Sequence, residues 1–89
     1  MKNNKFMLQK YQDLAADLVE ICNTNEKQNR QLLEYIIDEY LYLIDDNKMK
    51  ELEDIVYALD VYITENDDKI ADRLKHICYK IEAVLDEEN

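Results

Sequence analysis

Glycine and proline are both absent from this 89-residue chain. These two residues supply the positive backbone angles and the fixed kinks that tight turns, bulges and strand ends commonly use. Leucine, isoleucine, glutamate, lysine and aspartate dominate in their place. Such a composition favours helices joined by short polar turns, so we predict an all-α fold.

Apolar residues recur at steps of three and four along four stretches of the sequence. This spacing places them on one face of an amphipathic helix, and it predicts helices at about residues 4–23, 26–45, 48–64 and 68–86. The expected core positions are Met7, Tyr11, Leu14, Leu18, Ile21 or Cys22, Leu33, Ile36, Ile37, Tyr40, Ile44, Leu52, Ile55, Val56, Leu59, Ile63, Ile70, Leu74, Ile77, Ile81 and Val84. Leu32, Leu43 and Tyr62 are expected at the border of the core.

Three polar joints separate these helices, at residues 23–25, 45–47 and 65–68. Joints this short make consecutive helices antiparallel, which predicts a single domain, residues 1–89, folded as an antiparallel up-down-up-down four-helix bundle. Asn25 and Gln28 fit a capping box at the start of the second helix. The main alternative merges the second and third helices and gives a three-helix fold, which the acidic joint at 45–47 disfavours.

Two stripes of charge run beside the expected core of the first and fourth helices. The acidic stripe is Asp13, Asp17 and Glu20, and the basic stripe is Lys69, Arg73, His76 and Lys80. The two helices are neighbours in an up-down bundle, so we predict that the stripes pair across their seam. Exposed pairs of this kind contribute only about 0–1 kcal/mol each.

The sequence contains two cysteines, Cys22 and Cys78. In the predicted bundle Cys22 ends the first helix beside the start of the fourth, and Cys78 lies roughly 15 Å further along the fourth helix. A disulfide requires Cα atoms within about 7 Å of each other. We therefore predict two free thiols at the edge of the core.

The net charge is concentrated in residues 34–68, the acidic segment. This segment contains twelve carboxylates and two lysines, a net charge of −10, while the nine basic and nine acidic residues outside it cancel. Five of the seven tyrosines also lie within it. Charge and tyrosines on one segment indicate a protein-binding surface.

Three tyrosines of the acidic segment, Tyr35, Tyr42 and Tyr57, are expected to point away from the core, each between acidic residues. Tyrosine supplies contact area at low entropic cost, and neighbouring carboxylates pair with lysine or arginine on a partner. The alternative is that these tyrosines border the core with their hydroxyls in water. Tyr79, beside Lys75, is expected on a second, minor surface. The predicted partner-binding residues are Tyr35, Asp38, Glu39, Tyr42, Asp45, Asp46, Glu53, Asp54, Tyr57, Asp60 and Val61.

Motifs for catalysis and metal binding are absent from the sequence. With a single histidine, His76, no serine and no glycine, the chain has neither a Ser-His-Asp triad nor a glycine-rich phosphate loop. It has no Glu-x-x-His pair for a two-metal centre and no EF-hand loop. We therefore expect a protein that is not an enzyme and that uses no cofactor and no metal.

Charge and hydropathy limit the other partners. Direct nucleic-acid binding is disfavoured because contacts to phosphates need basic residues, and the chain carries a net charge of −10. No signal-peptide pattern and no apolar run of 18 or more residues occurs, so we expect no membrane span and a cytoplasmic location.

In size, acidity and helical design the chain resembles the small immunity proteins that bacteria pair with bacteriocin or contact-dependent toxins, some of which are nucleases. Phage-encoded inhibitors of host defence nucleases share these traits. The resemblance implies an inhibitor or antitoxin that binds a basic protein partner and occludes its nucleic-acid-binding cleft. The alternative is a non-catalytic helical adaptor or a self-associating regulatory subunit, although repulsion between acidic faces disfavours a homo-oligomer.

Overall fold

The computed structural model describes residues 4–25, 29–66 and 69–88. All the regular structure within these residues is helical, which confirms the all-α fold. The elements are α1 (Asn4–Thr24), α2 (Arg30–Asp45), the 3-10 turn η1 (Met49–Glu51), α3 (Leu52–Asn66) and α4 (Ala71–Glu88). The expected helix starts at residues 26 and 68, and the Gln28 half of the expected capping box, lie outside the described residues. Asn29 and residues 69–70, which were predicted to be helical, form turns, and α2 begins at Arg30 after its N-cap Asn29.

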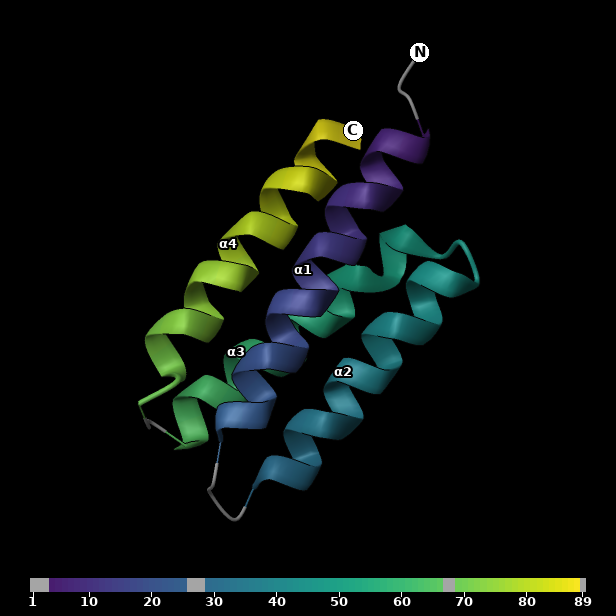
Figure 1. Cartoon of the computed structure of the whole chain (residues 1–89). Coiled ribbons are helices and arrows are strands. Elements are labelled where there is room, and N and C mark those ends of the chain that lie inside the picture. The colour runs from purple at the N-terminus through teal and green to yellow at the C-terminus, as the bar shows by residue number, and fades with distance from the viewer. Residues whose placement is uncertain (1–3, 26–28, 67–68, 89) are drawn as a thin grey trace.

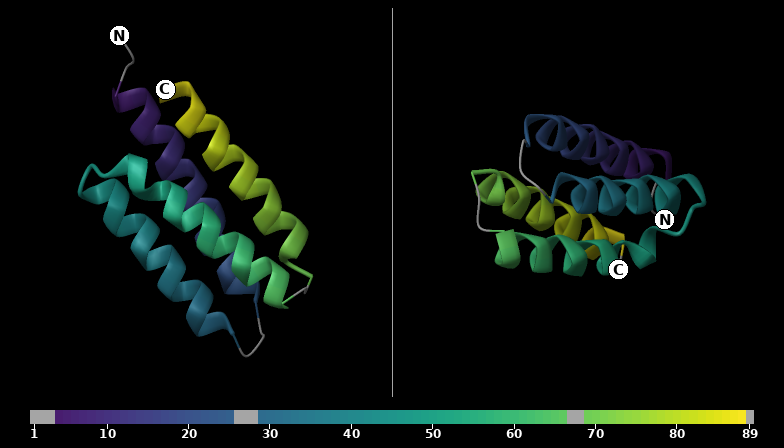
Figure 2. Two further views of the ribbon diagram at one scale, coloured as in Figure 1. Left: turned by 180° about the vertical axis from the view of Figure 1, so that it is seen from behind. Right: turned by 90° about the horizontal axis from the view of Figure 1, so that it is seen from below.

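The four helices pack side by side around one core (Figures 1 and 2). α1 contacts α2 and α4, and α3 contacts the same two helices. The molecule is a short rod measuring 43 × 19 × 18 Å. The N-terminal end of α1 lies beside the C-terminal end of α4 (Figure 1). Each helix therefore borders two neighbours, and each keeps an outer side.

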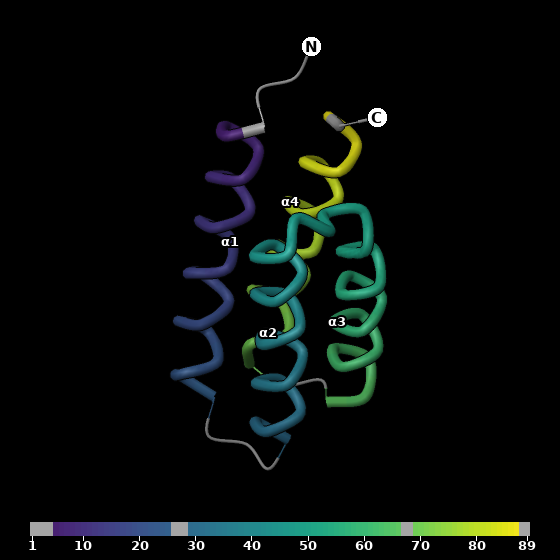
Figure 3. The backbone as a smooth tube through the Cα atoms, turned by 90° about the vertical axis from the view of Figure 1, so that its right-hand side faces the viewer, coloured from purple at the N-terminus to yellow at the C-terminus, as the bar shows by residue number. Residues whose placement is uncertain are grey.

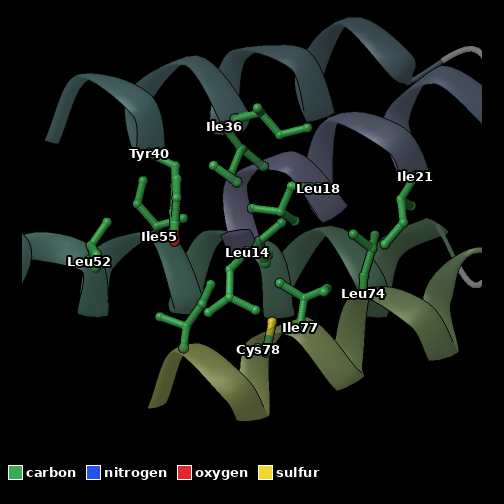
Figure 4. Close-up of a cluster of buried hydrophobic side chains, with 14 of the residues drawn as sticks. Leu14, Leu18, Ile21, Ile36, Tyr40, Leu52, Ile55, Leu74, Ile77 and Cys78 are labelled. Carbon is green, nitrogen blue, oxygen red and sulfur yellow. The ribbon is translucent and has the colours of Figure 1, made fainter. Parts of the chain in front are cut away.

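Apolar residues from all four helices form the core (Figure 4). Every expected core position is buried except Val56, which is half-buried and packs against the others. The border positions differ from one another, because Tyr62 is only 2% exposed whereas Leu32 is 45% exposed. The helical spacing thus predicts the core correctly, and the border positions depend on what each side chain meets in three dimensions.

Two buried tyrosine hydroxyls have hydrogen-bond partners inside the core. The Tyr40 hydroxyl of α2 donates to the main-chain carbonyl of Tyr11 in α1 at 2.6 Å. The Tyr62 hydroxyl of α3 accepts a 2.9 Å bond from the side-chain amide of Asn25. A buried polar group without a partner is costly, so these bonds allow large amphipathic residues to fill the core. Burial raises the pKa of Tyr40 well above its usual value, which keeps that hydroxyl protonated.

The connection from α2 to α3 is a helix stop built on Asn47. Asn47 has a positive φ of 58°, the left-handed conformation that glycine usually supplies and that asparagine tolerates best among the other residues. The Lys48 N–H donates to Leu43 O at 2.8 Å, and the Asn47 N–H donates to Ile44 O at 3.3 Å. These are the two bonds of a Schellman motif. α2 and α3 are therefore two separate helices (Figure 3), and the merged three-helix alternative is wrong.

The predicted pairing between the charged stripes of α1 and α4 is wrong. None of the seven stripe residues forms an ion pair within the described part of the chain, and Lys10 instead pairs with Glu87 at 2.8 Å. Asp17, Glu20, Arg73 and His76 line a shallow groove of about 340 Å³ between the two helices. Exposed charged side chains gain little from pairing in water, so stripes of opposite charge on adjacent helices need not form ion pairs.

Both cysteines are buried and free, as predicted. Burial, followed by the nearby Glu34 carboxylate, raises the pKa of the Cys22 thiol. Burial also raises the pKa of Cys78, to about 11, and the carboxylates of Asp60 and Glu82 add to the effect. The two thiols therefore serve as small apolar core residues.

Candidate functional site

The predicted partner-binding residues all lie on α2, on α3 or at the end of α2. Nine of the eleven are exposed, and the other two, Glu39 and Val61, are half-buried. The three tyrosines among them are more than half exposed, at 63% for Tyr35, 56% for Tyr42 and 71% for Tyr57. These tyrosines do not border the core with only their hydroxyls in water, so they are available for contact.

The structure does not bring the eleven residues together on one face. Asp38, Tyr42 and Asp45 line a groove between α1 and α2. Glu53, Tyr57 and Asp60 line a second groove, between α3 and α4. Tyr35, Glu39, Asp46, Asp54 and Val61 line neither of these grooves. The reason is geometric: each helix borders two neighbours, so residues on its outer side divide between the two directions.

The groove between α1 and α2, called here the α1/α2 groove, has a volume of about 840 Å³. Val19 from α1 and Leu41 from α2 face it and are 39% and 38% exposed. Asp38 and Asp45 stand along its α2 side. The full lining is Leu8, Gln12, Ala15, Ala16, Val19, Asp38, Leu41, Tyr42, Ile44 and Asp45. The result is a mainly apolar trough with two carboxylates on one wall.

Val19 and Leu41 are the site residues that the sequence reasoning missed. Both fall outside the apolar stripes that define the core positions. An apolar residue beside a core stripe is a weak signal, because scattered apolar residues are normal on protein surfaces. Only the packing of α1 against α2 shows that the two belong to one trough.

The groove between α3 and α4, called here the α3/α4 groove, is smaller, at about 360 Å³. Tyr57 and Tyr79 both line it, so Tyr79 does not lie on a surface of its own. Lys75 lines it as well, and the carboxylates of Glu53, Asp60 and Glu82 complete a mixed set of charges. Cys78 also contributes, but its raised pKa keeps the thiol protonated near neutral pH, where it is a poor nucleophile.

The carboxylates of the acidic segment mostly lack ion-pair partners. Ten of the twelve lie in the described residues, and two of these ten are paired: Glu34 with Arg30 at 3.0 Å and Asp46 with Lys48 at 3.2 Å. The other eight form no ion pair within the described part of the chain, namely Asp38, Glu39, Asp45, Glu51, Glu53, Asp54, Asp60 and Glu65. Their field is therefore directed into solvent.

Asp46, one of the predicted partner-binding residues, already has an ion-pair partner within the chain. The turn at Asn47 brings Lys48 back toward the end of α2, where its ammonium contacts the Asp46 carboxylate. The hydrogen bond to Asp46 raises the pKa of Lys48, and the same ammonium lies 5.9 Å from the centre of the Tyr42 ring. Lys48 thus occupies the position that a partner's cation would take beside Tyr42 and Asp46.

Across residues 4–25, 29–66 and 69–88, no group of three or more His, Cys, Asp or Glu side chains could hold a metal ion. None of the helices in these same ranges is long and apolar enough to cross a membrane.

Comparison of the chain with protein-family models, with curated proteins and with solved structures finds no match.

Proposed function

We propose that this chain is an acidic protein inhibitor of the immunity or antitoxin type. It binds a basic toxin or enzyme that acts on nucleic acid, and it occludes the basic cleft of that partner. The observation that carries the proposal is the set of eight carboxylates on and around α2 and α3 without ion-pair partners among the described residues. The charges outside residues 34–68 cancel, so the whole net charge of −10 belongs to the acidic segment.

Charge of this density favours a basic partner over other classes. Carboxylates that protrude from a helical rod attract a positively charged cleft and speed association, and they repel nucleic acid. Basic clefts are the usual feature of proteins that bind a phosphate backbone. The proposed function needs no catalytic group, cofactor or metal of its own.

The exposed tyrosines supply the contact area in this proposal. Tyrosine is enriched among the residues that dominate interface energy, whereas exposed charge mainly sets the association rate and the choice of partner. Tyr35, Tyr42 and Tyr57 are each exposed and each close in sequence to unpaired acids. We assign tight binding to these tyrosines and steering to the carboxylates.

A rigid scaffold is part of the proposal. We propose that consecutive helices alternate in direction, as an antiparallel up-down-up-down bundle. The short connections, and the position of the N-terminal end of α1 beside the C-terminal end of α4 (Figure 1), support this topology. A packed bundle holds the tyrosines in place before binding, which reduces the entropy lost on association.

The competing proposal is a self-associating helical subunit. Exposed large apolar residues such as Phe6 and Leu32 favour it, because such residues often take part in oligomer contacts. Repulsion between two chains of net charge −10 opposes it. Light scattering at low and high salt separates the two functions: an inhibitor stays monomeric at both, and a self-associating subunit forms dimers or larger species as salt screens the repulsion.

The inhibitor proposal is tested with the partner in hand. The chain is immobilised, proteins of its source cell are passed over it, and a retained basic protein is purified and assayed for nucleic-acid cleavage with one equivalent of the chain. The expected result is loss of cleavage, with association that slows as salt rises. Retention of no basic protein, or full activity of the retained protein in the complex, would contradict the proposal.

Charge-reversed variants sharpen this test. Glu39→Lys with Asp54→Lys changes two unpaired carboxylates of the acidic segment, and Asp13→Lys with Asp86→Lys makes the same change in net charge at exposed positions outside it. We expect the first pair to slow association with the partner by about tenfold or more and the second pair to change it far less, because steering depends on local charge. Equal effects of both pairs would show that only net charge matters.

A further inference from the structure

We propose that the α1/α2 groove binds an amphipathic basic α-helix of the partner protein. The inference rests on the proposed function, because it names the part of the basic partner that docks and the place where it docks. Its elements are the apolar lining of the groove, the length of that lining and the spacing of two carboxylates on its wall.

The floor and walls of the groove suit an apolar helical stripe. Val19 and Leu41 project from opposite sides and remain more than a third exposed, and both side chains gain free energy when a partner covers them. Ala15 and Ala16 also line the groove from α1, and their short side chains make this wall of the groove low. A low wall lets a third helix approach the pair closely, since the distance between packed helices depends on the side chains at the contact.

The length of the lining corresponds to a short helix. On α1 it extends from Leu8 to Val19, twelve residues, or about 16 Å of helix axis. A docked helix of about three turns covers this length and presents apolar residues at i, i+3, i+4 and i+7. This is the usual spacing of anchors when a helix binds in an apolar groove.

The carboxylates define the charge of the occupant. Asp38 and Asp45 both line the groove, are exposed and form no ion pair within the described part of the chain. They are seven residues apart on α2, or about 10 Å along its axis. A helix that packs lengthwise against α2 has the same rise per residue as α2. Lysine or arginine residues that are seven positions apart and lie beside its apolar stripe therefore face both carboxylates.

Other occupants fit these features less well. An acidic helix would meet Asp38 and Asp45 with the same sign of charge. A second copy of this chain does carry Arg73 and Lys80 seven residues apart on α4, but the apolar side of that helix, including Leu74 and Ile77, is buried in its own core. The α3/α4 groove already contains the cation of Lys75, so it discriminates less in favour of a basic helix.

The test uses a synthetic helical peptide as the probe, so it does not depend on finding the partner. The peptide has about four turns, leucine at i, i+3, i+4 and i+7, lysine at i+1 and i+8, and alanine and glutamine elsewhere. A second peptide of identical composition carries the lysines at i+2 and i+9, on the far side of the helix. Binding is measured by fluorescence anisotropy at about 0.15 M salt, where the screening length is about 8 Å.

We expect the first peptide to bind at least about tenfold more tightly than the second. Asp38→Lys with Asp45→Lys should weaken binding of the first peptide by about tenfold or more, and Leu41→Asp should weaken binding of both peptides. The matched control is Glu82→Lys with Asp86→Lys, which makes the same change of net charge at exposed positions outside both the groove and the acidic segment and should alter binding by less than about twofold. Circular dichroism checks that each variant is folded. If Leu41→Asp does not fold, the test still rests on the Asp38 and Asp45 substitutions, which are both at exposed positions.

Several results would overturn the inference. Two such results are equal binding of the two peptides and an equal loss of peptide affinity in the two double variants. A third is a dimer that excludes the peptide, which would mean that a second copy covers the groove. Failure of the inhibitor proposal gives a different result, because no basic protein is then captured or inhibited, whether or not the peptides bind. If a captured partner is inhibited equally well by the Asp38→Lys and Asp45→Lys protein, the function stands and the groove is not its docking site.

Discussion

The Tyr40 hydroxyl donates a 2.6 Å hydrogen bond to the main-chain carbonyl of Tyr11, and both residues are fully buried. The bond connects α2 to α1, the two helices that form the larger groove. We expect Tyr40→Phe to lower the free energy of unfolding by about 0.5–1.5 kcal/mol, because one buried bond is lost while the ring stays in place. Urea denaturation monitored by circular dichroism measures this change.

Tyr35→Phe is the control for that substitution. Tyr35 lies on the same helix and is 63% exposed, so its hydroxyl is free to bond to water. Removal of that hydroxyl should change the free energy of unfolding by less than about 0.5 kcal/mol. If the two substitutions have the same effect, the Tyr40 bond does not stabilise the pairing of α1 with α2.

Asn47 gives a second prediction, at the stop between α2 and α3. Its φ of 58° is unfavourable for any residue with a Cβ atom, and glycine adopts it freely. Asn47→Ala should therefore destabilise the protein by about 1 kcal/mol relative to Asn47→Gly. The two variants control for each other, since both lose the asparagine side chain. Equal melting temperatures would mean that the left-handed turn is absent in solution.

The core could be predicted from the sequence because burial follows the helical period. Leu33, Ile36 and Ile37 lie on one face of α2 whatever its neighbours are, and the structure buries all three. The burial of Tyr62 was harder to predict, since an amphipathic side chain at a border position is buried only if its hydroxyl has a hydrogen-bond partner. Asn25 supplies that partner, 37 residues away in sequence, and no local pattern shows it.

The arrangement of the predicted partner-binding residues was predicted less well than the core, for a related reason. Tyr42 and Tyr57 both point outward from their own helices, but one lies toward α1 and the other toward α4. A helical wheel gives a direction relative to the core and does not say which neighbour lies on which side. The pairing of Asp46 with Lys48 was missed similarly, because it depends on the Schellman turn that brings Lys48 back toward α2.

Cys78 gives a third prediction, on thiol chemistry. Burial raises its pKa from 9.0 to about 11, so the reactive thiolate is about one part in a thousand at pH 8, compared with about one in ten in an unfolded chain. We expect the Cys78 thiol of the native protein to react with a disulfide reagent at pH 8 at least about 100-fold more slowly than the same thiol in urea.

The direction of the pH effect follows from the raised pKa of Cys78. Burial penalises the thiolate in the fold and does not penalise the neutral thiol, so the contribution of Cys78 to stability is fully present below about pH 9 and is lost as the pH rises toward 11. Cys78→Ala should therefore melt at a lower temperature than the wild type at pH 7, and the difference should shrink between pH 9 and 11. A difference that stays constant over this range would contradict the assignment.

The last prediction separates the two grooves as contact sites for the partner. Tyr42 lines the α1/α2 groove and Tyr57 lines the α3/α4 groove, and both are more than half exposed. If the partner's helix docks in the α1/α2 groove, Tyr42→Ala should weaken binding by about 2 kcal/mol, mainly through faster dissociation, and Tyr57→Ala by less than about 1 kcal/mol. Both variants should melt within a few degrees of the wild type, since neither ring is in the core. Surface plasmon resonance with the captured partner measures the two dissociation rates, and a larger loss from Tyr57→Ala would move the docking site to the α3/α4 groove.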